Sequence, residues 1–347
     1  MTLPELLYYI GYSFDKRRKL KGQKRLSYPV ISIGNITVGG TGKTPATIAI
    51  AEEAKKRGLS PVILTKGYKG KAKGPCFVAP DSITPTLLFG DEPVLMAERL
   101  KDVPVVKCAD RYEGGMFAIE NLNSQILNFK SQIIFILDDG FQHWKLYRDM
   151  DVVLIDGLNL FGNRKMLPIG PLREPLKELK RADVFVVTKP PPPPPLDKGG
   201  MGGLSRELKH INPSASVYFS EYKTVKVRNA SGEEFPVETL KDKKVFAFCG
   251  IANPESFIQT VLSVCRDTAG SKIYGDHHRY SQADIFYLAE QSKTLNCDFL
   301  IATEKDMVKI KELRGLSSKF QIDNILCLEI EFVADAAFFD EVFKNIF

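Results

Sequence analysis

One glycine-rich loop restricts the fold of this chain more than any other segment: Val38-Gly39-Gly40-Thr41-Gly42-Lys43-Thr44. It follows an apolar stretch at 30–33 and leads into a helical stretch with Pro45 in its first turn and Gly58 beyond its end. This context matches the phosphate-binding pattern G-x-x-x-x-G-K-[ST], in which backbone N–H groups and the lysine hold phosphates and the hydroxyl binds Mg²⁺. Thr37 occupies the first glycine position of that pattern. A glycine-rich turn without a ligand is the alternative, and the flanking strand and helix favour the nucleotide site.

Short apolar runs alternate with helical stretches from Tyr28 to Lys189, which predicts an α/β fold with a mainly parallel sheet covered by helices on both faces. The expected strands are 30–33, 61–64, 103–107, 133–137, 152–155 and 184–187, and the expected helices are 45–56, 93–100 and 111–121. A second, smaller α/β unit has expected strands at 244–249, 299–302 and 325–330, and a hairpin of 217–227 and 234–237 precedes it.

These patterns divide the chain into five predicted segments. They are 1–27 (N-terminal helix and basic flank), 28–189 (P-loop domain), 190–215 (Pro/Gly-rich insertion and connector), 216–240 (hairpin linker) and 241–347 (second lobe). The insertion, Pro190–Gly203, is of low complexity and is expected to be an exposed loop without chemistry. A cleft between the two α/β lobes is a natural substrate site.

Composition narrows the classes of protein that this chain can be. Of its 347 residues, 44% are hydrophobic, which is enough for a core and fits roughly two domains. The six cysteines lie far apart without a C-x-x-C pair, which argues against a zinc site or a disulfide framework and fits a reducing, cytosolic compartment. No secretion signal is visible and no apolar stretch reaches about 18 residues, so a membrane-spanning helix is not expected.

Basic residues are concentrated near the N-terminus. Residues 1–25 carry seven Lys/Arg against two acidic residues, a net charge of +5, whereas the whole chain has +6. A nucleic-acid binder would need its basic surface on the folded body, so no nucleic-acid partner is expected. Apolar residues recur here at roughly helical spacing: Leu3, Leu6, Leu7, Tyr8, Ile10, Tyr12 and Phe14. The segment predicts a helix that either lies in a membrane interface, with its basic flank drawn to anionic headgroups, or packs on the protein with its charges solvated.

A second chemical signal follows the apolar strand at 133–137, where the sequence reads Asp138-Asp139-Gly140-Phe141-Gln142-His143. P-loop enzymes place a carboxylate that holds Mg²⁺ at the end of such a strand. Two adjacent aspartates also repel each other unless a cation lies nearby. A strand followed by Asp is common in ordinary turns, but together with the P-loop it favours a metal site.

Other polar clusters have both a structural and a chemical interpretation. Gly90-Asp91-Glu92-Pro93 opens a helix, where Asp91 can simply be the N-cap. Asp276-His277-His278 is either a surface pair or an oriented base that takes a proton from an attacking hydroxyl. Arg111 and Arg173 can bind phosphates through their planar guanidinium groups. Glu304-Lys305-Asp306 can do likewise or can start a helix.

In their order along the chain, these motifs closely resemble the tetraacyldisaccharide 4'-kinase family, the lipid A 4'-kinases. The resemblance rests on Ser32–Pro45, Gly90–Pro93, Asp138–His143 and Gly170-Pro171-Leu172-Arg173-Glu174-Pro175, and it extends into the second lobe through Asp276–His278 and Ala302–Asp306. It covers nearly the whole chain apart from the proline-rich insertion, and a threonine at the position of Thr37 is what that family shows.

The resemblance implies ATP-dependent phosphorylation of the 4'-hydroxyl of a lipid A disaccharide 1-phosphate precursor, tetraacyldisaccharide 1-phosphate, to give lipid IV-A in lipopolysaccharide biosynthesis. It implies a P-loop kinase domain and a Rossmann-like second lobe joined by a β-hairpin, with ATP as co-substrate and Mg²⁺. It also implies a peripheral enzyme at the cytoplasmic face of the bacterial inner membrane. Because the acceptor resides in the bilayer, the N-terminal helix is expected to contact the membrane.

Site residues follow from matching motif positions. Asp91 is expected to be the catalytic base and His277 its partner, since His277 rather than His278 directly follows Asp276. Lys43 and Asp139 are expected to take part in catalysis, and Thr44 and Asp138 to bind Mg²⁺. The nucleotide is expected on Thr37, Val38, Gly39, Gly40, Thr41, Gly42, Lys43 and Thr44. The acceptor or a phosphate is expected at Arg111, Gln142, His143, Arg173 and Glu174.

Two other classes of P-loop protein are possible. A GTPase or metallochaperone would carry N/T-K-x-D after a late strand, but Pro190 and Pro191 follow Thr188-Lys189, so the Asp is missing. Metal delivery would also need Cys/His clusters, and the sequence has none. A dimerising membrane-switch ATPase would carry an additional Lys before the Gly-Gly of the loop, where this chain has Val38.

Overall fold

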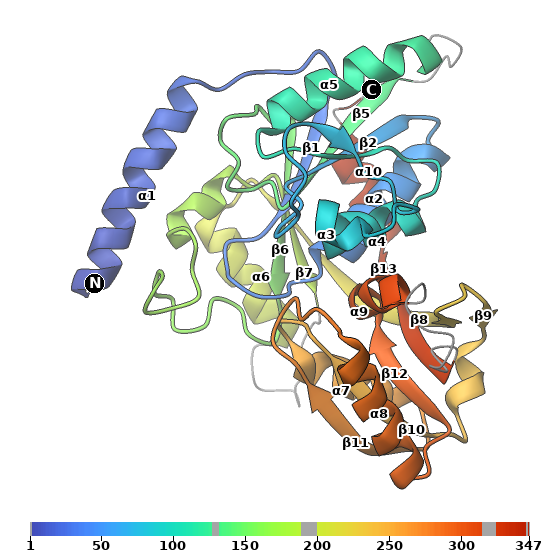
Figure 1. The fold of residues 1–347 in the computed structure, drawn as a ribbon. Coiled ribbons are helices and arrows are strands. Elements are labelled where there is room, and N and C mark those ends of the chain that lie inside the picture. Colours follow the sequence, from blue (N-terminus) through green and yellow to red (C-terminus); the bar gives the residue numbers. More distant parts are fainter. Residues whose placement is uncertain (1, 127–131, 189–199, 314–323, 345, 347) are drawn as a thin grey trace.

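A computed structural model of the chain describes residues 2–126, 132–188, 200–313, 324–344 and 346 (Figure 1). The first part of the chain contains α1 (Leu3–Lys21), β1 (Val30–Gly34), α2 (Lys43–Lys56), β2 (Ser60–Thr65), β3 (Cys76–Phe77), α3 (Pro85–Phe89), α4 (Asp91–Arg99), β4 (Val105–Lys107), α5 (Arg111–Ile126), β5 (Ile133–Asp138), β6 (Met150–Asp156), the 3-10 helix η1 (Leu176–Arg181), β7 (Val184–Thr188) and α6 (Gly200–Ile211). The second part contains β8 (Ser216–Asn229), β9 (Glu234–Phe235), the 3-10 helix η2 (Val237–Leu240), β10 (Lys244–Cys249), α7 (Pro254–Val264), β11 (Asp267–Ile273), α8 (Gln282–Thr294), β12 (Phe299–Thr303), α9 (Glu304–Lys311), β13 (Ile325–Ala334) and α10 (Ala336–Phe343).

One sheet runs through both lobes in the order β11-β10-β12-β13-β8-β7-β6-β1-β5-β2-β4-β3, with β9 paired to β8. Strands β13 and β8 pair antiparallel in the middle of this order. On both sides of them neighbouring strands pair parallel, except at the sheet edge, where β3 pairs antiparallel with β4. The hairpin expected at 217–237 is confirmed, because β8 and β9 pair antiparallel at Val227↔Phe235. The lobes are therefore joined by a continuous hydrogen-bonded ladder as well as by this hairpin.

Every strand expected between residues 30 and 188 is present, with ends that differ by at most two residues. These strands are almost entirely buried and mostly apolar because helices cover both sheet faces. Ile31 and Ile33 of β1 face a core cluster built by α2, α4 and α10, whereas Val30 faces the cluster under α5. The mainly parallel, doubly covered architecture predicted for the first lobe is thus confirmed.

The structure differs from the expected segment boundaries at two places. Pro190–Gly199 of the predicted insertion lies outside the described residues, but Gly200–Gly203, expected in a loop, form the first turn of α6. The C-terminal helix α10, assigned to the second lobe, packs in the first lobe through Phe338 and Val342. The reason is that β13, at ten residues, extends across the junction and delivers the chain back to the first lobe (Figure 1).

The N-terminal helix α1 is confirmed and has two different faces. One face packs on the body, where the hydroxyl of Tyr8 donates to the carbonyl of Arg173 (3.1 Å) and that of Tyr12 to Glu174 (3.2 Å). The other face exposes an apolar stripe at Leu3 (70%), Leu6 (37%), Leu7 (62%), Ile10 (55%) and Phe14 (72%). Across the described part of the chain, no helix combines the length and apolar character needed to span a bilayer.

Candidate active site

A cavity of about 670 Å³ lies where the P-loop of the first lobe faces the second lobe. Its walls include all eight residues expected to hold the nucleotide, Thr37–Thr44, together with Arg111, Asp138, Asp139, Arg173 and His277. The second lobe contributes the segments after β10, β11 and β12, so carboxyl ends of strands from both lobes meet here. Ligand sites of open α/β sheets form at such carboxyl ends.

Local backbone geometry shapes the P-loop for phosphates. Gly42, the N-cap of α2, has φ +82° and Gly39 has φ +109°, a region that residues with a Cβ rarely adopt. A Cβ at Gly42 would also meet the Tyr222 hydroxyl, which donates to the carbonyl of Thr41 (3.2 Å). The carbonyls of Thr41 and Gly42 both accept from Tyr222, and the loop leads directly into the N-terminus of α2, whose free N–H groups suit a polyphosphate.

Arg173 closes the loop from the other side. Its guanidinium forms two hydrogen bonds to Asp139, at 3.0 and 3.1 Å, and Nε donates to the carbonyl of Thr37 (3.1 Å). Its backbone N–H donates to the carbonyl of Ile36 (2.7 Å). Nζ of Lys43 lies 3.6 Å from Asp139. Two cations, Lys43 and Arg173, therefore converge on Asp139 beside the P-loop.

The pKa values of the two adjacent aspartates are shifted in opposite directions. Burial, with the charges of Glu92 and Asp139, raises the pKa of Asp138 to about 6, although Lys43 and a hydrogen bond from Thr65 (3.0 Å) act in the other direction. For Asp139, burial also acts to raise the pKa, but Lys43 and Arg173 outweigh it and hold the pKa well below its usual range. Asp138 is thus a buried carboxyl that lacks sufficient positive charge, whereas Asp139 already has it.

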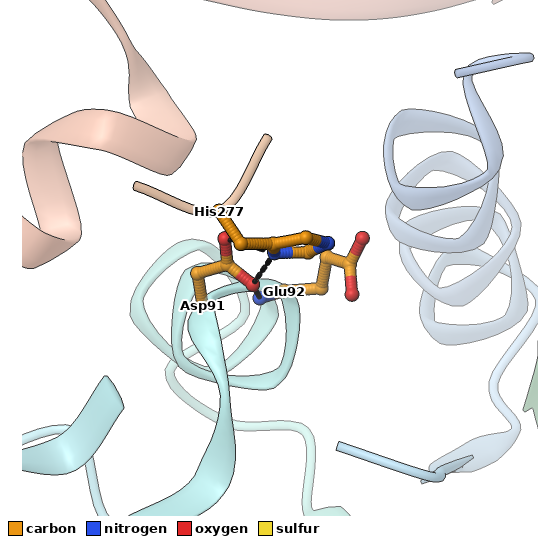
Figure 2. A group of neighbouring side chains, drawn as sticks. All are labelled: Asp91, Glu92 and His277. Carbon is orange, nitrogen blue, oxygen red and sulfur yellow. Dashed lines mark hydrogen bonds and ion pairs between the residues drawn. The ribbon is translucent and has the colours of Figure 1, made fainter. Parts of the chain in front are cut away.

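Asp91 of the first lobe and His277 of the second lobe contact each other in this site. Nδ1 of His277 lies 2.8 and 3.0 Å from the two carboxylate oxygens of Asp91 (Figure 2). Burial acts to raise the pKa of Asp91, but the hydrogen bond from His277 and the charge of Lys305 lower it to about 2. His277 lines the cavity, whereas Asp91, expected as the base, is buried behind it (5% exposed). The carboxylate therefore orients the imidazole, and the two groups form one unit.

His278, the other histidine of the motif, has a structural environment. Its ring stacks on Tyr274 with centroids 4.3 Å apart, and its Nε2 lies 3.3 Å from Asp284. The structure thus places His277, and not His278, against Asp91.

Three expected substrate residues lie behind the P-loop instead of on the cavity wall. The amide of Gln142 donates to the carbonyl of Asn35 (2.8 Å) and to Glu174 (2.7 Å), and Glu174 is fully buried beside Arg181. Burial lowers the pKa of His143 to about 3, with Arg111 acting in the same direction. These contacts connect the P-loop with α1, and a direct role for the three residues at the substrate stays a prediction. Arg111, by contrast, lines the cavity at the start of α5.

Sequence reasoning did not assign Glu92 to the site, and it left Lys305 open between a phosphate contact and the start of a helix. Glu92 lines the cavity beside His277, and Nζ of Lys305, from the second lobe, donates to it at 2.8 Å. Glu92 belongs to the motif Gly90–Pro93 and Lys305 to the motif Ala302–Asp306. Their pairing could not be predicted, because the two residues lie 213 positions apart in the sequence.

The residues present fit a divalent cation. Thr44 and the buried Asp138 share the cavity, and a cation would supply the positive charge that Asp138 lacks. Among the described residues, Asp91, Glu92 and His277 also form a group whose ligand atoms lie within 4.8 Å of one another, with the imidazole between the two carboxylates (Figure 2). Oxygen ligands such as the Thr44 hydroxyl and the Asp138 carboxylate are of the kind that Mg²⁺ prefers.

The fold and the site together define a P-loop enzyme of phosphoryl transfer, with a phosphate loop, converging cations and an oriented Asp–His pair across one cavity. Comparison with known proteins identifies the family within this class. The model of the tetraacyldisaccharide-1-P 4'-kinase (LpxK) family matches residues 6–347, and the chain belongs to this family.

Individual relatives agree with the family model. The tetraacyldisaccharide 4'-kinase of Desulfotalea psychrophila is 37% identical over 297 residues, covering 85% of this chain and 82% of the relative. That of Syntrophus aciditrophicus is 33% identical over 320 residues, covering 86% and 80%. The crystal structure of LpxK from Aquifex aeolicus in complex with ATP superimposes with a TM-score of 0.71 at 27% identity, covering 99% of this chain and 97% of that one. The family resemblance read from the motifs is thereby confirmed.

Proposed function

We propose that the chain transfers the γ-phosphoryl group of Mg-bound ATP to the 4'-hydroxyl of tetraacyldisaccharide 1-phosphate. The observation that carries this proposal is the Asp91–His277 pair, which faces the P-loop across the cavity with Nδ1 2.8 Å from the carboxylate. A sugar hydroxyl is a poor nucleophile, and an oriented base within reach assists its deprotonation in the transition state. The names of the relatives and the ATP complex of the similar structure support the same donor and acceptor.

Different residues of the chain have different functions in the proposed reaction. Backbone N–H groups of the P-loop and Nζ of Lys43 bind the β- and γ-phosphates, while Arg173 and Arg111 neutralise charge that spreads over the transferred group. Thr44 and Asp138 would hold Mg²⁺, which would supply positive charge to neutralise the phosphates. His277, oriented by Asp91, accepts the proton of the 4'-hydroxyl as its oxygen bonds to phosphorus and the bond to the β-phosphate oxygen breaks.

We further propose that the enzyme works as a peripheral protein at the cytoplasmic face of the inner membrane. The exposed stripe on α1 from Leu3 to Phe14 supports this, since an apolar helix face beside a basic flank suits an anionic lipid surface. The opposite face of α1 bonds to Arg173 and Glu174, so the membrane contact and the phosphate site are joined by one helix.

The decisive experiment supplies labelled ATP, Mg²⁺ and tetraacyldisaccharide 1-phosphate in detergent micelles to the purified full chain. Label should enter a bis-phosphorylated lipid, and an acceptor whose 4'-hydroxyl is replaced by hydrogen should receive none. Failure to label the lipid, together with rapid GTP turnover, would mean that the chain is not this kinase.

A further inference from the structure

Asp306 lies beneath the active site and makes an unusual set of contacts there. Its side chain is fully buried near the start of α9. Oδ2 accepts hydrogen bonds from the backbone N–H of Gly250 (3.1 Å) and from the hydroxyl of Thr303 (2.7 Å), while Oδ1 lies 2.8 Å from Nζ of the buried Lys309. A buried ion pair is often no more stabilising than an apolar pair of similar volume. Thr303 is also the N-cap of α9 and accepts from the backbone N–H of Asp306 (3.1 Å), but neither this cap nor the ion pair requires the hydrogen bond from Gly250.

Gly250, directly after β10, links Asp306 to the catalytic histidine. Its N–H donates to Asp306, and its carbonyl accepts a hydrogen bond from the backbone N–H of His277 (3.0 Å). A Cβ at Gly250 would lie 3.0 Å from Cβ of His278 and 3.1 Å from the carbonyl oxygen of Gly275. The turn that carries both histidines thus packs directly on this glycine, and the position of Gly250 sets the position of the turn.

His277 needs such support because its backbone is strained. Its φ of +59° lies in the left-handed region, which is unfavourable for a residue with a Cβ and persists where surrounding contacts impose it. The backbone hydrogen bond to Gly250 is one of these contacts, and the imidazole hydrogen bond to Asp91 is another. If the first contact is lost, the turn can relax and carry the imidazole away from Asp91.

We propose that Asp306 is a positioning residue for the phosphoryl transfer: through Gly250 it holds the left-handed turn at His277 and so keeps the imidazole aligned with Asp91. The inference rests on the proposed function of the Asp91–His277 pair. Helix α9 also contacts the other side of the site, because Lys305, the residue before Asp306, donates to Glu92, the neighbour of Asp91.

Two double variants with matched charge separate the hydrogen bond to Gly250 from the ion pair. Asp306→Asn with Lys309→Met removes the ion pair but keeps a carbonyl oxygen that can accept from Gly250. Asp306→Leu with Lys309→Met removes the ion pair and the acceptor together. We expect the first to keep kcat within about 3-fold of the wild type, and the second to lose about 10²-fold in kcat with a nearly unchanged KM for ATP, since misplacing a reacting group by about 1 Å can have such an effect.

The His277→Ala background tests whether the effect passes through the histidine. If it does, Asp306→Leu with Lys309→Met should reduce kcat by less than about 2-fold in that background, because contributions that act through one group are not additive. An equal loss in both backgrounds, or full kcat in the folded Leu variant, overturns the inference. Should the Leu variant not fold, Gly250→Ala tests the same link: its methyl group must displace the turn, with the same dependence on His277.

A readout independent of turnover keeps this inference separate from the proposed reaction. The chain has four histidines, so imidazole ¹H–¹⁵N spectra can resolve the Nδ1–H of His277 bonded to Asp91. That signal should persist in the Asn variant and disappear in the Leu variant. Its persistence in both would overturn the positioning function of Asp306. Absence of lipid labelling by the wild type, with the spectral difference present, would overturn only the proposed reaction.

Discussion

Replacing Asp138 by Asn tests whether this active site is built around a cation. Burial raises the pKa of this carboxyl from 3.8 to about 6, with Glu92 and Asp139 adding to the effect. An acid whose pKa is higher in the folded than in the unfolded state is unfavourable to the fold when it is ionised. This destabilisation of the folded state is absent below the pKa that the carboxyl has in the unfolded chain, grows between pH 4 and pH 6, and is complete above pH 6. At about 1.4 kcal/mol per pKa unit, it amounts to about 3 kcal/mol at pH 8 without a divalent cation.

The Asn variant should therefore be more stable than the wild type and inactive. An amide oxygen can still accept the hydrogen bond from Thr65, which lies at 3.0 Å, while the charge is gone. In EDTA at pH 8 we expect a gain of about 3 kcal/mol, or a rise in Tm of about 4 °C if the entropy of unfolding is roughly 2 cal/mol/K per residue. At pH 4.5 the gain should shrink to about 1 kcal/mol, because wild-type Asp138 is then largely protonated. Mg-ATP should stabilise the wild type more than the variant.

Asp139→Asn is the matched control, since the same change one residue later should have the opposite sign. Lys43 and Arg173 outweigh burial at this carboxyl and hold its pKa well below its usual range. An acid of this kind stabilises the fold above its unfolded pKa, and that contribution is lost as the pH falls. In thermal denaturation at pH 8 in EDTA, Asp138→Asn should thus have the highest Tm, the wild type an intermediate Tm and Asp139→Asn the lowest. An Asp138→Asn protein that melts below the wild type, or a gain that does not change with pH, would refute the cation-site reasoning.

Three further predictions concern the reaction and the membrane. Asp91→Ala should lower kcat by about 10²-fold or more with little change in ATP affinity measured by calorimetry, and normal turnover would show that Asp91 is only the first residue of α4, whose N-cap is Gly90 rather than the Asp91 that the sequence suggested. Arg173→Lys keeps the charge but loses the two parallel hydrogen bonds to Asp139, so kcat should fall by about 10-fold, against little change for Arg164→Lys on the exposed surface. Replacing Leu7 and Phe14 by Ser should weaken sedimentation with anionic vesicles without lowering Tm, because both side chains are exposed; undiminished binding would contradict the interfacial helix.

Much of this site could be predicted because its parts are local in sequence. The P-loop, the Asp138-Asp139 pair and the helix at 91–99 each follow a strand or open a helix, and parallel strands place such segments at one edge of the sheet. The pairing of Asp91 with His277 came from family motifs, since no local pattern relates residues 186 positions apart.

Long-range geometry could not be predicted from these patterns. Nothing local in Ile325–Ala334 indicates that this strand crosses the junction and returns α10 to the first lobe. The first turn of α6 contains Gly202 and Gly203, which disfavour helix formation, yet Leu204 and Leu208 of that helix are buried against the core. Tertiary burial therefore outweighed the local propensity that predicted a loop. Likewise, Gln142 and Glu174 lie in motifs that border the site, and only packing shows that their side chains turn away from the cavity.

The low pKa of Asp91 explains why so much of the structure is devoted to geometry. A carboxyl whose pKa is about 2 is a weak base, and the proposed acceptor of the proton is accordingly His277, which Asp91 orients. Phosphoryl transfer, however, passes through a loose transition state in which the attacking hydroxyl loses its proton late, so alignment and charge neutralisation matter more than base strength. An Asp91 that stays ionised at every physiological pH can orient His277 permanently, while from α9 Lys305 binds Glu92, the neighbour of Asp91, and Asp306 binds Gly250, which supports the turn at His277. The strained turn at His277 and the buried ion pair beneath it are then understandable as the structural requirements of a reaction that depends on position.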